Sequence, residues 1–468
     1  MLMAANSAAQ ILPAVAAPLI TRIYDPRQFG IMAVVLAAFG ILAPIACLRY
    51  DIAIVLPERE EEAAQIAALS LAIPTGLATV LTMLLVVAEH LALQNRIQLV
   101  VPSLLEMLPA GIFLLGFQLT AHAWSLRIHH FRLVALATFF QALITIVVQL
   151  ALGRILAPTV STLVIGSLCG YAVASLIYAP LLIRAVLPSL RAHATAKGIV
   201  AALRQYRRFP LITGPYAFLG QFSVRGAFFV IGIWMPPSIV GQYALAQRVA
   251  FLPVSTASTA LGQIFYSRAS RRLDEPKTND VVHTILRVSP WIIGPFFLLL
   301  AFFGTHLFGF VFGARWIQAG QFAAILAGAS LLKTSTSWLD RVFDIRSRQH
   351  IALTLEFAFA ALALVAMDVV LGRTHNANAA VAAYALGVGV FFLVWATVAI
   401  KVANFNSRII FDYLASTVCM GATMTIAYTL LHWLRAPLSG QVALTVLLAA
   451  TLCALGFRQM RTRIAAAG

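Results

Sequence analysis

The sequence predicts an all-α polytopic membrane protein with about fourteen transmembrane helices, and three observations support that fold class. Of the 468 residues, 61% are hydrophobic and only 10% are charged, whereas about a quarter of a soluble domain is charged. The mean hydropathy is +0.91, and the apolar residues are spread along the whole chain. The basic residues also alternate in density from one short loop to the next. Because no soluble fold hides so much apolar surface, the bilayer must be the solvent for most of the chain.

Each crossing of the bilayer needs about 20 apolar residues. We therefore expect transmembrane helices near residues 2–21, 31–48, 64–88, 99–124, 133–153, 159–187, 209–234, 239–265, 281–310, 321–345, 351–372, 378–402, 409–433 and 438–457. The connections between them are short, except for residues 188–208. That stretch is polar and basic, and we expect it to carry an amphipathic helix.

The distribution of basic residues predicts the orientation. With a cytoplasmic N-terminus, 23 of the 33 lysines and arginines lie in cytoplasmic loops and 7 lie on the other side. Cytoplasmic loops carry the excess of positive charge in membrane proteins. The bias therefore predicts that both termini are cytoplasmic, and because this requires an even number of crossings, it supports fourteen. The remaining three cations, Arg225, Arg248 and Lys333, fall within expected spans.

Several function classes do not fit this sequence. A net charge of +17 would suggest nucleic acid as the partner of a soluble protein, but here the charge lies in short loops between apolar runs, so we expect no nucleic-acid partner. The four cysteines lie far apart in apolar stretches without metal-ligand spacing, and we interpret them as packing residues. The sequence has no nucleophile triad, phosphate-binding glycine loop or metal-ligand set. We therefore expect a transporter with no catalytic residue, no metal and no cofactor.

Two hairpins share a short pattern that indicates an internal repeat. Pro26 is followed after three residues by Gly30 in the first hairpin, and Pro237 is followed in the same way by Gly241 between the seventh and eighth expected helices. Proline fixes the turn, while glycine lets the next helix start in close contact with its neighbour. Two homologous halves around a midplane cavity are a common transporter plan. We expect an N-terminal six-helix bundle at 1–187, a basic cytoplasmic linker at 188–208, a C-terminal six-helix bundle at 209–403, and helices 13 and 14 with a cytoplasmic tail at 404–468.

Several motifs together resemble one protein family. Residues 22–30 read RIYDPRQFG, residues 48–57 read LRYDIAIVLP, residues 241–249 read GQYALAQRV, and residues 313–316 read GARW. In this order and spacing they resemble the bacterial polysaccharide transporters, the Wzx-type oligosaccharide-lipid flippases of the multidrug/oligosaccharidyl-lipid/polysaccharide exporter superfamily. The resemblance covers roughly residues 15–350. Asp51 stands where the family often has Glu, which keeps the charge.

The resemblance implies a flippase that moves undecaprenyl-diphosphate-linked oligosaccharides across the inner membrane by alternating access, for O-antigen, capsule or exopolysaccharide synthesis. It also implies two helix bundles around a central cavity. The expected partners are the lipid-linked oligosaccharide, membrane lipids, a polysaccharide polymerase and a chain-length regulator. Since each half has its partner within the chain, we expect a monomer. Without an ATP-binding motif, an ion gradient, the membrane potential or downstream consumption of the cargo would have to supply the energy.

The three cations within expected spans are candidate substrate-binding residues, because an unpaired charge at the bilayer centre costs about 2.5–3.5 kcal/mol even on the lenient scale. Arg225 shares a helix face with Gln221, and its planar guanidinium suits bidentate contact with a phosphate. A structural pair with a neighbouring helix is the alternative, and the same two interpretations apply to Arg248. Lys333 lies at helical spacing from Asp340, and an ion pair between them is at least as well supported as cargo contact.

Polar residues of the first half are further candidates. Two stripes at helical spacing contain Gln118, His122 and Ser125, and Gln141, Thr145 and Gln149. Gln118 and Gln141 could hydrogen-bond the glycan, although polar residues also hold helices together in membranes. Arg22, Arg49 and Asp51 lie near the two ends of the first hairpin, where they could gate the path or serve as interface anchors or a structural ion pair.

Three rival functions are open at this point. A drug/cation antiporter of the same superfamily would rely on membrane-embedded carboxylates, whereas the deeper charges here are mainly cationic, which favours an anionic cargo. A lipid II flippase is close in mechanism and differs mainly in the headgroup. A membrane-embedded polysaccharide polymerase would need a sizeable outward loop for its catalytic groups, and the expected outer loops are short.

Overall fold

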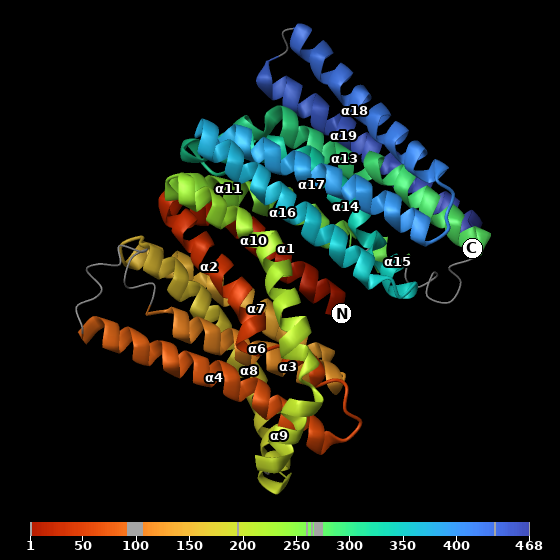
Figure 1. Ribbon diagram of the computed structural model, residues 1–468. Helices are drawn as coiled ribbons and strands as arrows, with labels where there is room; N and C mark the ends of the chain where they lie inside the picture. The colour runs from red at the N-terminus through yellow and green to blue at the C-terminus, as the bar shows by residue number, and fades with distance from the viewer. Residues whose placement is uncertain are drawn as a thin grey trace. The chain divides into compact units, whose positions relative to one another are not determined.

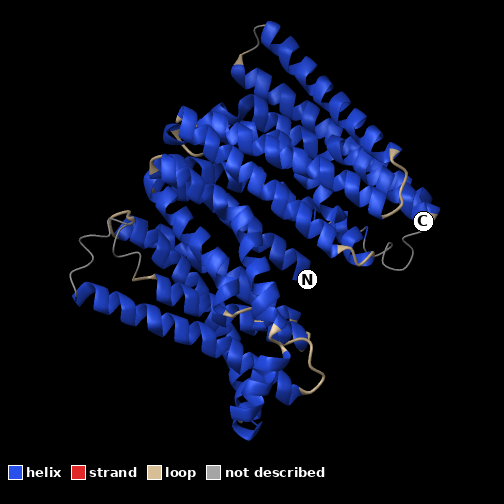
Figure 2. Ribbon diagram, in the orientation of Figure 1, coloured by secondary structure: helices blue, strands red, loops and turns tan. Residues whose placement is uncertain are grey.

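The computed structural model describes residues 2–90, 106–193, 196–258, 261–263, 265, 275–434 and 437–467. Throughout this described part the regular structure is helical, without any strand (Figure 2). The chain divides into two compact units, one formed by Met1–Gly232 with Pro236–Gly241 and the other by Ile233–Met235 with Gln242–Gly468. Residues 209–232 thus belong to the first unit, and the boundaries of the two expected six-helix bundles stay a prediction.

The first unit consists of long helices with two short ones among them (Figure 1). They are α1 Leu2–Ile23, α2 Pro26–Ala46, α3 Tyr50–Ala53, α4 Glu60–His90, α6 Leu108–Arg127, α7 Phe131–Ile155, α8 Val160–His193, α9 Ala196–Gln205 and α10 Gly214–Trp234, the last of which follows a π-helical turn at Phe209–Thr213. Helix α7 packs along both α1 and α8, and α4 packs along α6. The short helix α9 lies within the expected basic linker.

The second unit holds the remaining helices. They are α11 Pro237–Ala250, whose first turn belongs to the first unit, α13 Pro276–Val311, α14 Ile317–Thr336, α15 Asp340–Ile345, α16 Gln349–Thr374, α17 Ala377–Val402, α18 Arg408–Trp433 and α19 Leu438–Ala467. A π-helical turn at Val254–Ser258 and 3-10 turns at Ala314–Trp316 and Ser337–Leu339 lie between them. Helix α13 packs against α14, α18 and α19.

Ten helices of the described residues are long and apolar enough to cross a membrane. They are α2, α4, α7, α8, α10 with its preceding turn, α13, α16, α17, α18 and α19. Large apolar side chains cover the outer faces of these helices, and Phe310 and Phe411 are 85% and 70% exposed. A soluble monomer rarely exposes so much apolar surface, so the chain is a multi-pass membrane protein. The full count of fourteen crossings stays a prediction.

The span expected at 239–265 is not one continuous helix. Regular α-helix ends at Ala250 and a π-helical turn follows at Val254–Ser258. Pro253 lies at the interruption, where its missing N–H and its ring disfavour a continuing α-helix.

The span expected at 321–345 is interrupted as well. Helix α14 ends at Thr336, and a 3-10 turn separates it from the short α15. Just before the break, the hydroxyls of Thr334 and Thr336 donate to carbonyl oxygens one turn earlier, each at 2.7 Å. Such bonds bend helices because the hydroxyl competes with the backbone N–H groups. The change of helix type alters which residues share a face with Lys333.

The Pro26 hairpin shows why its sequence begins a helix. Asp25 is the N-cap of α2: its carboxylate accepts from the Gln28 backbone N–H at 2.8 Å, and the Gln28 side chain accepts from the Asp25 N–H at 2.9 Å. This reciprocal capping box satisfies two backbone donors that would otherwise lack partners. Pro26 fits the first helical position because its fixed φ already matches the helix.

The two repeated glycines pack directly against each other. A Cβ atom added to Gly30 would lie 1.8 Å from the Pro237 carbonyl oxygen, and one added to Gly241 would lie 1.9 Å from the Pro26 carbonyl oxygen. The contact is reciprocal, so the starts of α2 and α11 cross with their backbones touching. The sequence repeat therefore marks a real close contact within the first unit.

Each unit has its own buried core. In the first unit, α3, α4, α6 and α8 pack around Tyr50 and Trp124. In the second, Trp338, Phe343 and Trp395 lie at the centre, with the rings of Phe343 and Trp395 4.8 Å apart.

Candidate functional site

A cavity of about 270 Å³ lies within the helices of the first unit. Its lining comes from α2, α6, α7 and α8 and consists of Ala43, Leu115, Gln118, Leu119, His122, Ala137, Thr138, Gln141 and Tyr178. Amide, imidazole and hydroxyl groups thus share the space with aliphatic side chains. None of these lining residues is a carboxylate.

The cavity joins the two polar stripes expected from helical spacing. Gln118 of α6 and Gln141 of α7 both line it. The Gln118 side-chain amide donates to the Tyr171 carbonyl oxygen on α8 at 2.7 Å, which holds it in place. Within the described part of the chain, the side-chain amide of Gln141 has no hydrogen-bond partner, so it is available to a ligand.

The stripe on α7 divides into a binding end and a packing end. Gln149, two turns beyond Gln141, is buried and donates to the Leu163 carbonyl oxygen on α8 at 2.9 Å. Thr145 packs where α7 meets Gly170 of α8, whose added Cβ would lie 2.0 Å from the Thr145 hydroxyl oxygen. Thr145 and Gln149 therefore make contacts between α7 and α8, which fits the packing alternative considered for these polar residues.

Arg225 is not among the residues that line this cavity, but it contacts a helix that contributes to the lining. Its guanidinium rests on Gly40 of α2, where an added Cβ would be 2.4 Å from Arg225 Cζ. One turn along α2, Ala43 lines the cavity, and residues three apart share a helix face. The Tyr171 phenol on α8 is also close enough to Arg225 for an electrostatic interaction. The structure therefore places the guanidinium of Arg225 on α2, one turn from the cavity-lining Ala43, and near Tyr171.

The guanidinium of Arg225 keeps most of its hydrogen-bonding capacity. Its Nε donates to the Gln221 side-chain oxygen at 3.1 Å, one turn earlier on α10. Among the described residues no carboxylate pairs with Arg225, which is half-buried. Since a guanidinium has five N–H donors, the others remain for an anion.

Lys333 in the second unit has a different environment. Its ammonium nitrogen lies 4.3 Å from the ring centroid of Phe251 and 5.8 Å from that of Phe392. Glu356 of α16 is close enough for an electrostatic interaction with it. Asp340, the partner expected from helical spacing, instead lies 3.7 Å from Arg341, and both side chains are half exposed. The 3-10 turn before Asp340 explains this, since it breaks the helical spacing.

The other predicted residues do not join the cavity lining. Arg248 is half-buried on α11 in the second unit, and no ion pair to it occurs in the described part of the chain. Arg22 is exposed near the end of α1. The roles expected for both residues stay predictions.

Arg49 and Asp51 form a tight turn between α2 and α3. A nitrogen of Arg49 lies 3.7 Å from an Asp51 carboxylate oxygen, and Asp51 is only 5% exposed. Leu48 and Arg49 both have left-handed backbones, with φ of 46° and 60°, which strains residues other than glycine. Burial raises the pKa of the Asp51 carboxyl, and the Arg49 charge opposes that rise.

Two cavity residues were missed in the sequence. Thr138 lies three residues before Gln141 on α7, so the helical spacing that found Gln141 could also have found Thr138. Tyr178 comes from α8, and only the packing of α8 against α6 and α7 brings it to the cavity. No sequence signal pointed to it.

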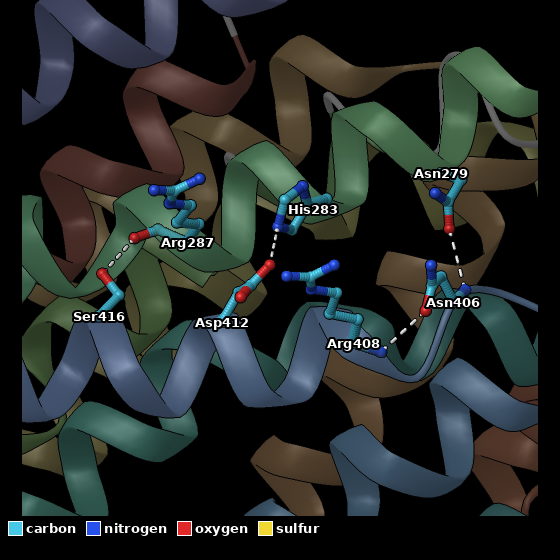
Figure 3. A network of polar contacts seen from close by, with 7 residues as sticks. All are labelled: Asn279, His283, Arg287, Asn406, Arg408, Asp412 and Ser416. Atoms are coloured by element: carbon cyan, nitrogen blue, oxygen red, sulfur yellow. Dashed lines mark hydrogen bonds and ion pairs between the residues drawn. The ribbon is translucent and has the colours of Figure 1, made fainter.

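A polar network in the second unit was also missed. His283 Nε2 of α13 lies 2.8 Å from a carboxylate oxygen of Asp412 on α18 (Figure 3). Ser416 donates to the Arg287 carbonyl oxygen at 2.5 Å and accepts from the Trp291 indole N–H at 2.8 Å. These contacts fasten α18 along α13, and their residues are 125 or more positions apart in the chain. Only the tertiary structure could reveal them.

The cavity in the first unit suits binding more than catalysis. Among the described residues, no group of three or more histidine, cysteine or acidic side chains could hold a metal ion. The polar groups around the cavity offer neutral hydrogen bonds and one unneutralised guanidinium. Such a set can hold a phosphate together with neutral hydroxyl-bearing groups.

The sequence matches one family model, described as "Polysaccharide biosynthesis protein", over residues 19–321. No curated protein sequence gives a significant match.

Several solved structures share the fold. The lipid II flippase MurJ in an inward closed conformation has a TM-score of 0.72 at 12% identity, covering 97% of both chains. A multidrug resistance MATE family transporter of the MOP superfamily, inward-facing, has a TM-score of 0.57 at 16% identity, covering 86% of this chain and 94% of that one. A MOP superfamily transporter from Pyrococcus furiosus, described as having a binding pocket of reverse polarity, has a TM-score of 0.55 at 16% identity, covering 87% of this chain and 93% of that one.

Proposed function

The chain belongs to the polysaccharide biosynthesis protein family, and from this premise we propose that it is a flippase for oligosaccharides linked to undecaprenyl diphosphate. It carries the lipid-linked unit across the inner membrane by alternating access, for O-antigen, capsule or exopolysaccharide synthesis. It acts without catalysis of its own, with both termini in the cytoplasm and fourteen crossings. The fold it shares with MurJ and the MATE transporters supports a transporter.

The observation that supports the proposal is the polar cavity together with Arg225, whose guanidinium rests on α2 one turn from the cavity-lining Ala43. The cargo has a diphosphate, which needs a cation, and a glycan, which needs neutral hydrogen-bonding groups. Arg225 supplies the cation, while Gln118, Gln141 and Thr138 supply amides and a hydroxyl. The absence of a carboxylate from the cavity lining favours such an anionic cargo over a drug cation.

The test is transport in proteoliposomes that contain an undecaprenyl-diphosphate-linked oligosaccharide. Flipped glycan is measured as the fraction that an added lectin can reach. We expect Arg225→Ala to slow transport by about 30-fold or more, because truncating one partner of a buried charged contact costs about 2–5 kcal/mol. Arg225→Lys keeps the charge but loses bidentate geometry, so it should retain part of the activity.

A matched control separates a binding role from general damage. Arg154 is an exposed arginine at the end of α7, away from the cavity lining, and Arg154→Ala should transport normally. All variants are compared at equal amounts of inserted protein. Wild-type transport by Arg225→Ala would overturn the assignment of the cavity.

A lipid II flippase is the second candidate, because the similarity to MurJ spans 97% of both chains. At 12% identity that likeness concerns the fold and leaves the headgroup undecided. The same proteoliposomes loaded with lipid II distinguish the two: preferential transport of lipid II would replace the first proposal. Uptake of a cationic dye driven by an ion gradient would indicate the drug/cation antiporter instead.

The remaining expectations follow from the proposal. A polysaccharide polymerase and a chain-length regulator would receive the flipped unit. The chain acts as a monomer and draws its energy from the membrane potential, from an ion gradient or from consumption of the cargo. Arg248 and Lys333 are further cation candidates for the path.

A further inference from the structure

The basic linker is held at the membrane surface by its neighbours in the chain. Residues 184–208 contain six lysines and arginines and no acidic residue. The candidate span Val160–Pro188 precedes the linker, and the candidate span Phe209–Trp234 follows it directly. Both flanking segments are long and apolar enough to cross a bilayer, so we expect the linker to lie at a membrane surface, with its arginines within reach of lipid phosphates.

One face of the linker helix is fixed to the first unit. Ala202 is buried in the core of that unit. The Tyr206 hydroxyl and the Gln205 amide both donate to a Glu62 carboxylate oxygen on α4, at 2.9 and 3.0 Å. The Tyr50 hydroxyl donates to the Leu203 carbonyl oxygen at 3.5 Å. The helix α9 is thus a docked element with a defined inner face.

The opposite face of α9 is basic and exposed. Val200 and Arg204 lie four residues apart on α9, so they share an exposed face, and Arg207 and Arg208 are exposed just after the helix ends. Within the described residues no carboxylate pairs with any of the three arginines. Glu62 points at the inner face, where its acceptor oxygen is already bonded. The outer face therefore carries three uncompensated guanidinium groups.

Exposed apolar side chains continue this face into the next span. Leu211 and Ile212 are 70% and 65% exposed and lie three and four residues after Arg208. The basic residues followed by exposed apolar residues match an anionic phospholipid, whose headgroup lies at the membrane surface and whose acyl chains lie below it.

We propose that the outer face of α9 and the turn after it is a docking surface for the headgroups of anionic phospholipids. Polybasic segments on an amphipathic helix beside a transmembrane helix bind such headgroups. Guanidinium groups bind phosphate oxygens bidentately, while Leu211 and Ile212 contact the acyl chains. A bound lipid holds α9 against α3 and α4. The surface is separate from the cavity, so it does not depend on the identity of the cargo.

The test measures lipid binding by the full-length protein in a neutral detergent. A fluorescent phosphatidylglycerol is titrated, with the matching phosphatidylcholine as reference. We expect wild type to prefer phosphatidylglycerol, with an affinity that falls as salt is added. Each surface charge contributes about fivefold, so R204Q/R207Q/R208Q should lower the phosphatidylglycerol affinity by about 10- to 100-fold and leave phosphatidylcholine binding unchanged.

The matched control removes three other exposed arginines, Arg154, Arg315 and Arg373, with the same loss of charge. R154Q/R315Q/R373Q should keep wild-type phosphatidylglycerol affinity. The melting temperature of each variant without anionic lipid verifies folding. Unchanged binding by R204Q/R207Q/R208Q, or an equal loss in the control, would overturn the proposal.

Competition identifies the source of the phosphate group. Inorganic phosphate and glycerol phosphate should displace the labelled lipid only weakly, because they cannot contact Leu211 and Ile212. Equally strong displacement by either would show a free-anion site and refute lipid docking. Tighter binding of a soluble acidic peptide than of the lipid would indicate a protein partner and would also refute it.

Discussion

Arg225 and Lys333 are both half-buried cations within expected spans, yet the two units surround them differently. Arg225 rests on a glycine, makes one hydrogen bond to Gln221 at 3.1 Å and adjoins a polar cavity. Lys333 lies over the ring of Phe251 at 4.3 Å, with Glu356 within electrostatic range. Aromatic faces and a nearby carboxylate can stabilise an ammonium group such as that of Lys333 without any further partner. A guanidinium that makes one hydrogen bond to a neutral partner, as Arg225 does, still has unused N–H donors. The difference supports the proposal that Arg225 contacts cargo, and it favours helix bracing over cargo contact as the role proposed for Lys333.

The largest effect is expected from a substitution that displaces the Arg225 side chain without removing it. Gly40→Ala adds a Cβ that would lie 2.4 Å from Arg225 Cζ, so the flexible guanidinium must shift away. We expect transport to fall about tenfold, because misplacement of a positioning group by about 1 Å can cost a factor as large as 10². Stability should change little, since only the end of a long side chain has to move. Proteoliposome transport and melting temperature measure the two effects.

The control for that substitution is Gly76→Ala. An added Cβ at Gly76 would meet no atom within 4 Å. This variant should transport normally and gain slightly in stability, since alanine favours helix more than glycine does. If Gly40→Ala transports as well as Gly76→Ala, the position of the Arg225 guanidinium is unimportant.

The second prediction concerns Lys333. Lys333→Met keeps a long side chain but removes the charge, so it deletes the cation–π contacts with Phe251 and Phe392. We expect a loss of about 1–2 kcal/mol in the free energy of unfolding, with transport reduced by less than about threefold. Urea unfolding in detergent and the proteoliposome assay measure these quantities.

An opposite result at Lys333 would change the comparison. A transport defect as large as that of Arg225→Ala, with normal stability, would mean that Lys333 contacts cargo, as its position in an expected span first suggested. Glu356→Gln serves as the companion variant. If Lys333 is a brace, this variant should lower stability in the same direction, because Glu356 interacts with the Lys333 ammonium.

The smallest effect is expected at Asp51, in the short helix α3. Burial raises the pKa of its carboxyl above the unfolded value. The folded state therefore binds the Asp51 proton more tightly than the unfolded state does. The resulting contribution to the free energy of unfolding is fully present below the unfolded pKa of about 3.9 and is lost as the pH rises through the folded-state pKa. Asp51→Asn removes the titration, so the variant should gain stability relative to wild type as the pH rises from about 4 to about 7. Melting temperatures across this range measure the difference, and a difference that stays constant with pH would contradict the prediction.

Much of the fold was predictable because hydropathy acts along the chain. The helix expected at 378–402 is observed as Ala377–Val402, and the one expected at 409–433 as Arg408–Trp433. Whether each expected span is one continuous helix was predicted less well. Two expected spans are interrupted, one near Pro253 and the other just after Thr336, whose hydroxyl bonds the backbone one turn earlier. Such breaks depend on local backbone hydrogen bonds, to which hydropathy is insensitive.

The candidate site was predictable in part for the same reason. Helical spacing placed Gln118 and Gln141 on polar stripes, and both line the cavity. The same spacing placed Asp340 beside Lys333, but a 3-10 turn intervenes. Tyr178 gave no signal, because its contribution depends on which helix packs beside which.

By itself the sequence determined that the protein is a helical membrane protein, and its motifs pointed to a family of polysaccharide transporters. Those properties depend on composition, on the order of apolar and basic segments and on short motifs, all of which can be read locally. The tertiary structure decided which buried cation is compensated and which is free. Arg225 and Lys333 look alike in sequence, and only packing placed Gly40 beside one and Phe251 beside the other. The energy of a buried charge depends on its neighbours in space, and those neighbours come from distant parts of the chain.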